Sequence, residues 1–280
     1  MVISRREKSM KQLLSIVQDD HRNGSKSVAR NFLTACRAHL KESRHSINEY
    51  KLLFGRVKNL RPSMVILFNT CLQLEKLCLE EDCDTDAIDL NISTLLAELD
   101  RADELITKQL ISLAVTLPLK SILVHSYSST VASVIRQLAA KQIIESVICT
   151  ESRPQLEGVT FANDLSRVTK TMVVVDTMAD VVMQDCDGIL IGADAVDKSG
   201  NILNKIGSRM IALSARNHTI PVICLAERLK IHPSLSAWEI PIEMNRPDEL
   251  GFTTEPGVSV LNRYFEVVER DLLTHCIFDN

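Results

Sequence analysis

The chain has 280 residues and 45% hydrophobic side chains, enough apolar material for one large or two modest packed domains. Its net charge of −4 leaves no basic surplus to neutralise phosphates, so we expect no direct nucleic-acid partner. No apolar run approaches the ~20 residues that cross a bilayer, and the first residues are charged where a signal peptide would be apolar. We therefore expect a cytoplasmic protein with no membrane partner.

The chain before Pro118 shows the apolar spacing of helices almost throughout. One break falls at Asn23–Gly24–Ser25, which also offers a helix cap, and another at Arg61–Pro62–Ser63, where the proline suits a first helical turn. The predicted helices cover residues 4–21, a second stretch ending near residue 40, residues 46–59, a fourth stretch from Pro62 to about residue 80, and residues 86–113 with a candidate break near Asn91.

Strands and helices alternate after Pro118. The strands are short and apolar without polar alternation, which is typical of strands buried on both faces of a parallel sheet. They are expected at residues 121–126, 146–150, 171–176, 188–193 and 220–226, and residues 238–243 and 264–268 are candidates for a further strand or a cap on the sheet. The expected fold class is α/β, with a helical N-terminal domain over residues 1–117 and a second domain with a mostly parallel sheet over residues 118–280, which the family resemblance given below identifies as Rossmann-like.

Eight cysteines are scattered along the chain without a CxxC pair or a Cys/His ligand spacing. Several lie inside apolar runs such as VICT and VICLAE. This pattern is typical of reduced thiols packed as small hydrophobic side chains, and it does not favour a structural zinc site.

The stretch DGILIGADAVDKSGNILNKIG, residues 187–207, carries the strongest chemical signal. Asp194 follows the apolar run of a predicted strand, and Asn204 and Lys205 precede Gly207, which opens a helical pattern. Ligands bind at the carboxyl ends of strands in open α/β sheets. Lys205 and the amides of a helix start suit a phosphate, whereas Asp194 suggests proton transfer or recognition of a hydroxyl.

Polar residues also follow the other predicted strands, and parallel strands bring these ends to one rim of the sheet. The hydroxyls of Ser128, Ser129 and Thr130 suit a helix cap first, and they also suit an anionic ligand. Arg153 beside a proline is a candidate for the same ligand or for an ion pair with a neighbouring carboxylate. Lys230 adds a further cation to the rim, so a phosphorylated ligand explains the convergence best.

His125 and Ser126 are adjacent on a predicted strand. Successive strand side chains point to opposite faces, so the two should not form a nucleophilic Ser–His pair. His125 is expected to be a packed or supporting histidine.

The strings ILVHSYSST, TESRPQLEG, GADAVDKSGNILNKIGS and VICLAERLK together resemble one family. It joins the alpha, beta and delta regulatory subunits of translation initiation factor 2B with methylthioribose-1-phosphate and ribose-1,5-bisphosphate isomerases. Upstream, NGSKSVA resembles the loop that closes the family's sugar-phosphate site, and LRPS resembles its Arg-Pro turn. The resemblance implies a helical domain followed by a Rossmann-like domain, a homodimer or higher oligomer, translation-factor subunits as candidate partners, and no metal or other cofactor.

The resemblance also implies roles for residues of this chain. The family's catalytic acid falls on Asp194, and the isomerases' cysteine falls on Ser126, which is the main departure. A serine hydroxyl is not ionised unless a base activates it, whereas a cysteine with a pKa of about 8.5 yields a thiolate near neutral pH. The implied contacts with the phosphosugar, together with the rim arginine, are Gly24, Ser25, Arg61, Ser128, Ser129, Thr130, Arg153, Asn204, Lys205 and Lys230.

Three interpretations stay open on the sequence. The first is a regulatory protein of the alpha-subunit type that binds a phosphorylated sugar or nucleotide, and the second is an aldose–ketose isomerase acting on ribose 1,5-bisphosphate or methylthioribose 1-phosphate. The third is an α/β scaffold whose site has decayed. Ser126 favours the regulatory protein, because alpha-type subunits also lack the cysteine, while Asp194 favours the isomerase.

Overall fold

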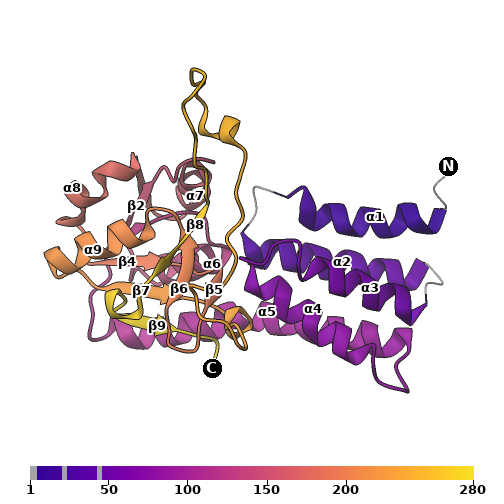
Figure 1. The fold of residues 1–280 in the computed structure, drawn as a ribbon. Coiled ribbons are helices and arrows are strands. Elements are labelled where there is room, and N and C mark those ends of the chain that lie inside the picture. The colour runs from indigo at the N-terminus through magenta and orange to yellow at the C-terminus, as the bar shows by residue number, and fades with distance from the viewer. Residues whose placement is uncertain (1–4, 21–23, 43–45) are drawn as a thin grey trace.

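The computed structural model describes residues 5–20, 24–42 and 46–280. Within these residues the N-terminal part is all helical and the C-terminal part is an α/β sheet structure, side by side (Figure 1). The predicted α/β class with a helical N-terminal part is therefore confirmed.

The helical part contains α1 (Arg5–Gln18), α2 (Ser25–Glu42), α3 (Ile47–Val57), α4 (Val65–Leu77) and α5 (Thr85–Ala114). Their apolar faces meet in one core, in which Phe32 of α2 and Phe54 of α3 pack edge to face with ring centroids 6.4 Å apart. The predicted helices are all present. Asn23, part of the predicted first break, lies outside the described residues.

Two details of the helical prediction are wrong. Helix α5 is continuous over 30 residues, with no break at Asn91, because Ile88, Ile92 and Leu95 on both sides of that residue pack in the helical core. Pro62 does not lie in the first turn of α4, which begins only at Val65. The amide of Val65 donates a hydrogen bond to the carbonyl oxygen of Asp194 at 3.2 Å, so contact with the α/β part holds the start of this helix.

Helix α5 connects the two parts. Its N-terminal half belongs to the helical core, while Ile106 and Leu110 near its C-terminus lie in the core of the α/β part. Figure 1 shows α5 running from beneath the helices to beneath the sheet. The predicted boundary between residues 117 and 118 stays a prediction.

The main sheet is parallel and has six strands in the order β3-β2-β1-β4-β7-β9. From the centre of the sheet, β1, β2 and β3 follow one another toward one edge, and β4, β7 and β9 follow one another toward the other edge. This is the arrangement of a doubly wound Rossmann-like sheet. The strands are β1 (Ser121–Val124), β2 (Ser146–Thr150), β3 (Lys170–Val174), β4 (Gly188–Ile191), β7 (Val222–Leu225) and β9 (His275–Ile277), and the helices among them are α6 (Ser129–Ala140), α7 (Glu157–Leu165), α8 (Ala179–Met183) and α9 (Ser208–His218).

A second, antiparallel sheet has the order β5-β6-β8, from β5 (Ala195–Val196), β6 (Ile202–Lys205) and β8 (Phe265–Val268). The tail segment 264–268 thus forms a strand of this sheet rather than of the main one, and residues 238–243 form no strand. The sequence prediction missed β5, β6 and β9. Asn204 and Lys205 consequently lie on β6 and not at a helix start.

Candidate functional site

A cavity with an empty volume of about 750 Å³, its open mouth included, lies at the carboxyl edge of the main sheet. It is lined by Ser126–Ser129 after β1 and by Gly192–Asp194 after β4. These two strands are the neighbours at which the strand order reverses, the usual ligand site in this architecture. The helical part supplies Gly24, Ser25, Lys26, Arg61 and Met64, so the cavity is shared between the two parts of the chain.

Two helices begin at the cavity wall. Ser128 is the N-cap of α6, and its Oγ accepts a hydrogen bond from the Val131 amide at 3.3 Å, which confirms the predicted cap. Helix α2 begins at Ser25, beside Gly24. The free amides and the positive dipole end of a helix start attract an anion such as a phosphate. Gly192 lets the loop after β4 approach this cap closely, because a Cβ there would lie 2.8 Å from Ser128 Oγ.

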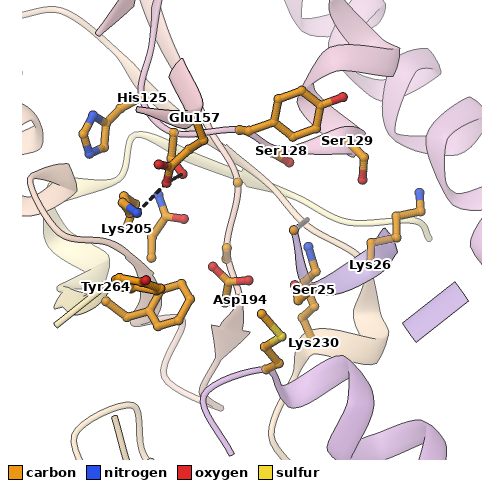
Figure 2. A pocket seen from close by; sticks show the side chains of 18 of the residues that line it. Ser25, Lys26, His125, Ser128, Ser129, Glu157, Asp194, Lys205, Lys230 and Tyr264 are labelled. Atoms are coloured by element: carbon orange, nitrogen blue, oxygen red, sulfur yellow. Dashed lines mark hydrogen bonds and ion pairs between the residues drawn. The ribbon is translucent and has the colours of Figure 1, made fainter. Parts of the chain in front are cut away.

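Asp194 reaches into the cavity and is partly exposed to it (Figure 2). Its amide donates to the Leu203 carbonyl oxygen at 2.8 Å, which fixes the backbone of this residue against β6. Burial raises the pKa of the Asp194 carboxyl above its usual range, while Lys230 and a hydrogen bond with Ser25 oppose the rise. A carboxyl group of this kind keeps its proton more readily than an exposed one, which suits a general acid.

Lys205 and Glu157 form an ion pair on the wall of the cavity (Figure 2). Lys205 Nζ lies 2.5 Å from Glu157 Oε1 and 4.7 Å from the centre of the Tyr264 ring. The same Glu157 oxygen accepts a hydrogen bond from Ser126 Oγ at 3.1 Å. Ser126 has a left-handed backbone with φ of 66°, which departs from the strand geometry of β1 and turns its side chain toward Glu157.

A buried charge cluster lies where the helical part meets the sheet. Glu227 follows β7 and forms ion pairs with Lys230 at 2.8 Å and with Lys26 at 3.1 Å. Thr130 Oγ1 donates a hydrogen bond to the same carboxylate. Burial alone would raise the pKa of Glu227, but Lys230 and Lys26 hold it at about 2. Lys26 also pairs with Asp103 of α5 at 2.5 Å. The carboxylates of Glu227 and Asp103 therefore balance the positive charges of Lys26 and Lys230 at this end of the cavity.

His125 is buried, as expected of a packed histidine, and its ring nitrogens bond to partners other than Ser126, although both residues lie beyond the end of β1 and not on the strand as predicted. Its Nε2 lies 2.8 Å from the Ile206 carbonyl oxygen, so this nitrogen carries the proton, and its Nδ1 accepts from Thr150 Oγ1 at 2.6 Å. Burial lowers the pKa of the imidazole, which therefore stays neutral. Both ring nitrogens are occupied, so His125 has no lone pair to offer a ligand.

The structure brings ten of the twelve predicted site residues to the cavity. Thr130 and Arg153 do not line it. Thr130 is buried against Glu227, and the exposed Arg153 side chain donates to the Leu250 carbonyl oxygen. The ten that line the cavity are Gly24, Ser25, Arg61, Ser126, Ser128, Ser129, Asp194, Asn204, Lys205 and Lys230.

Sequence reasoning assigned no role to Lys26, Glu157 and Tyr264, which also line the cavity. Glu157 stands in the string TESRPQLEG and Lys26 directly follows Ser25, so the motifs that locate the other site residues also contain these two. Tyr264 had no such signal, because β8 brings it to the cavity from far along the chain. Its hydroxyl donates to Glu249 and accepts from Gln155 Nε2 at 2.7 Å.

Other kinds of site find no support among residues 5–20, 24–42 and 46–280. No group of three or more His, Cys, Asp and Glu side chains there is arranged to hold a metal ion. None of the helices formed by those residues is both long and apolar enough to cross a membrane. All eight cysteines are free thiols, as the sequence predicts.

A Rossmann-like sheet with a polar, cation-rich cavity at its switch point is the arrangement in which open α/β proteins bind their ligands. The family model of the Initiation factor 2 subunit family matches residues 21–280. The chain belongs to this family, which confirms the family expected from its sequence motifs.

Known relatives include isomerases. A putative methylthioribose-1-phosphate isomerase of Pyrococcus furiosus is 32% identical over 250 residues, covering 81% of this chain and 69% of the relative. A ribose 1,5-bisphosphate isomerase of Methanocaldococcus jannaschii is 32% identical over 151 residues, covering 52% of this chain and 49% of the relative. The crystal structure of the translation initiation factor eIF-2B of Pyrococcus horikoshii OT3 superposes with a TM-score of 0.84 at 22% identity, covering 99% of this chain and 96% of that chain, and shows the same fold.

Proposed function

We propose that the chain is an aldose–ketose isomerase acting on a ribose 1-phosphate derivative of the ribose 1,5-bisphosphate or methylthioribose 1-phosphate type. The observation that carries the proposal is the Asp194 carboxyl, which faces the cavity with a raised pKa beside anion-binding helix starts. The names of the relatives support this choice over a purely regulatory protein.

The proposed arrangement assigns the phosphate to the amides at the start of α6, with Ser128, Ser129 and Arg61 around it. Asp194 then donates its proton to the ring oxygen of the sugar, which opens the ring between C1 and that oxygen. The same carboxylate later takes the proton of the C2 hydroxyl as the ketone forms.

The test is incubation with ribose 1,5-bisphosphate and with methylthioribose 1-phosphate, followed by detection of the ketose product. The Asp194→Asn variant should lose about 10²–10⁴-fold in turnover while it still binds the sugar phosphate, as seen by thermal shift. Asp185→Asn, an exposed carboxylate outside the cavity, is the matched control and should behave as the wild type. Full turnover by Asp194→Asn would contradict this function.

A second candidate is a regulatory protein that binds a phosphorylated sugar or nucleotide without converting it. Ser126 favours it, because a serine stands where the isomerases resembled here carry a cysteine. Ligand binding without turnover in the same assay would select this candidate. A homodimer or higher oligomer and contacts with translation-factor subunits stay predictions for either function.

A further inference from the structure

Proton transfer between C2 and C1 of a sugar needs a base as well as an acid, and Ser126 cannot be that base by itself. An unassisted serine hydroxyl does not ionise near neutral pH. The structure nevertheless gives Ser126 a partner, since its Oγ donates to Glu157 Oε1 at 3.1 Å. A carboxylate is therefore hydrogen-bonded to the residue that stands where the resemblance places a cysteine thiolate.

We propose that Glu157 is the general base of this site and takes over the role of the missing cysteine. This inference rests on the isomerase function proposed above. Glu157 is the first residue of α7 and lines the same cavity as Asp194, and the close view shows both side chains on its wall, with Glu157 paired to Lys205 (Figure 2). The site would thus use two carboxyl groups with separate tasks, Asp194 as the acid and Glu157 as the base.

The contacts of Glu157 suit a base. Ser126 and Lys205 both bind Oε1, and they hold the carboxylate in one orientation. The other oxygen, Oε2, is shielded from solvent and has no hydrogen-bond partner among the described residues. A shielded carboxylate oxygen without a hydrogen-bond partner carries a free-energy cost, which points to a functional reason for its place, and its lone pairs are unoccupied.

The other polar side chains of the cavity are less suited. His125 has both ring nitrogens in hydrogen bonds. The Tyr264 hydroxyl is bound to Glu249, and no cysteine is among the described residues that line the cavity. Among those residues Asp194 and Glu157 are the carboxylates, and the first is assigned to the acid.

The steps balance without a redox partner. Asp194 protonates the ring oxygen, and the bond between C1 and that oxygen breaks. Glu157 takes the proton from C2, and the electron pair of that C–H bond forms the C1–C2 double bond. Glu157 then returns the proton to C1, while Asp194 takes the proton of the C2 hydroxyl, which becomes the ketone. Both carboxyl groups end in the state in which they began.

Three variants test the assignment with the ribose phosphates used above. Glu157→Gln keeps the size and hydrogen-bonding capacity of the side chain but removes the base, so turnover should fall about 10²–10⁴-fold while the thermal shift on ligand binding is kept. Glu157→Asp keeps a displaced base and should retain measurable turnover. Adding Ser126→Cys to Glu157→Gln supplies a thiolate and should restore part of the lost turnover. Glu145→Gln, which breaks the exposed pair with Lys120, is the matched control and should leave turnover unchanged.

A reaction in D₂O gives a readout that a structural role would not change. Deuterium on C1 of the ketose identifies proton transfer through a base that exchanges with solvent, whereas a direct hydride shift leaves none there. Glu157→Gln with turnover within 10-fold of the wild type, or with the same deuterium content on C1 as the wild type, overturns the assignment but leaves the isomerase function intact. A wild type that forms no ketose from either sugar phosphate overturns the isomerase function and this assignment with it.

Discussion

Lys26 Nζ lies 3.1 Å from Glu227 Oε1, and this pair joins helix α2 of the helical part to the loop after β7. Lys230 approaches the other carboxylate oxygen at 2.8 Å, so one buried carboxylate lies between two buried lysines. Both lysines line the cavity. The shape and charge of the candidate site therefore depend on how the helical part packs against the sheet.

The first prediction concerns the stability of this cluster. Glu227→Gln leaves two lysines buried without their shared carboxylate, and breaking a buried pair in this way costs about 3–5 kcal/mol. Unfolding in urea should show a loss of that size. The exposed pair between Lys120 and Glu145 gives the control, because Glu145→Gln should change the free energy of unfolding by less than about 1 kcal/mol. Equal stability of the two variants would contradict the role given to Glu227.

The second prediction follows from the pKa of the same residue. Glu227 titrates at about 2 in the folded chain instead of at 4.5. A depressed pKa contributes stability that is present above the ordinary value and is lost as the pH falls toward the folded value. The free energy of unfolding of the wild type should therefore decrease between pH 4.5 and about 2, and Glu227→Gln should decrease less over that window. Urea unfolding at a series of pH values measures both slopes, and parallel slopes would count against the assignment.

The helices could be predicted from their apolar spacing and the five predicted strands from their short, wholly apolar runs, because both are local patterns of the sequence. Of the strands that were missed, β5 and β9 have only two and three residues, and the four residues of β6 include Asn204 and Lys205 instead of a wholly apolar run. Strand β6 exists because it pairs with β8, a partner far along the chain. Such pairing is decided by tertiary contacts that no local pattern contains.

The site residues also fall into some that could be predicted from local sequence and others that could not. Asp194 and Ser128 could be predicted because each follows a strand directly, and the end of a parallel strand already fixes where its next residues lie. Arg153 also follows a strand, but its side chain turns away to the Leu250 carbonyl oxygen. Tyr264 reaches the cavity through the antiparallel pairing of β8. Strand ends therefore locate a site, while the direction of each side chain depends on contacts from elsewhere.

The third prediction concerns the approach of Gly192 to the start of α6. A methyl group at residue 192 would lie 2.8 Å from Ser128 Oγ and 2.9 Å from its Cβ, so Gly192→Ala must displace the cap or the loop. Such overpacking costs about 1–3 kcal/mol of stability, and it should also weaken binding of a sugar phosphate. Chemical unfolding and thermal shift with ribose 1,5-bisphosphate measure the two effects. Gly55→Ala in helix α3, away from the cavity, should leave ligand binding as it is.

The fourth prediction identifies the reactive thiol. A hydrogen bond from the Cys224 thiol lowers the pKa of Cys276 to about 7, and Cys276 is partly exposed at the edge of the sheet on β9. Burial raises the pKa of the other partly exposed thiol, Cys83. Because the thiolate is the species that reacts, iodoacetamide at pH 7 should modify Cys276 first in the folded chain.

Peptide mass spectrometry after short exposures to iodoacetamide would show which thiol is modified first. Cys276→Ser should abolish the fast phase, and Cys83→Ser should leave it in place. Cys224→Ala removes the donor, so it should raise the pKa of Cys276 and slow its modification at pH 7 without affecting Cys83. If Cys83 reacts as fast as Cys276 in the wild type, or if Cys224→Ala does not slow Cys276, the hydrogen bond between the two neighbouring strands does not control this thiol.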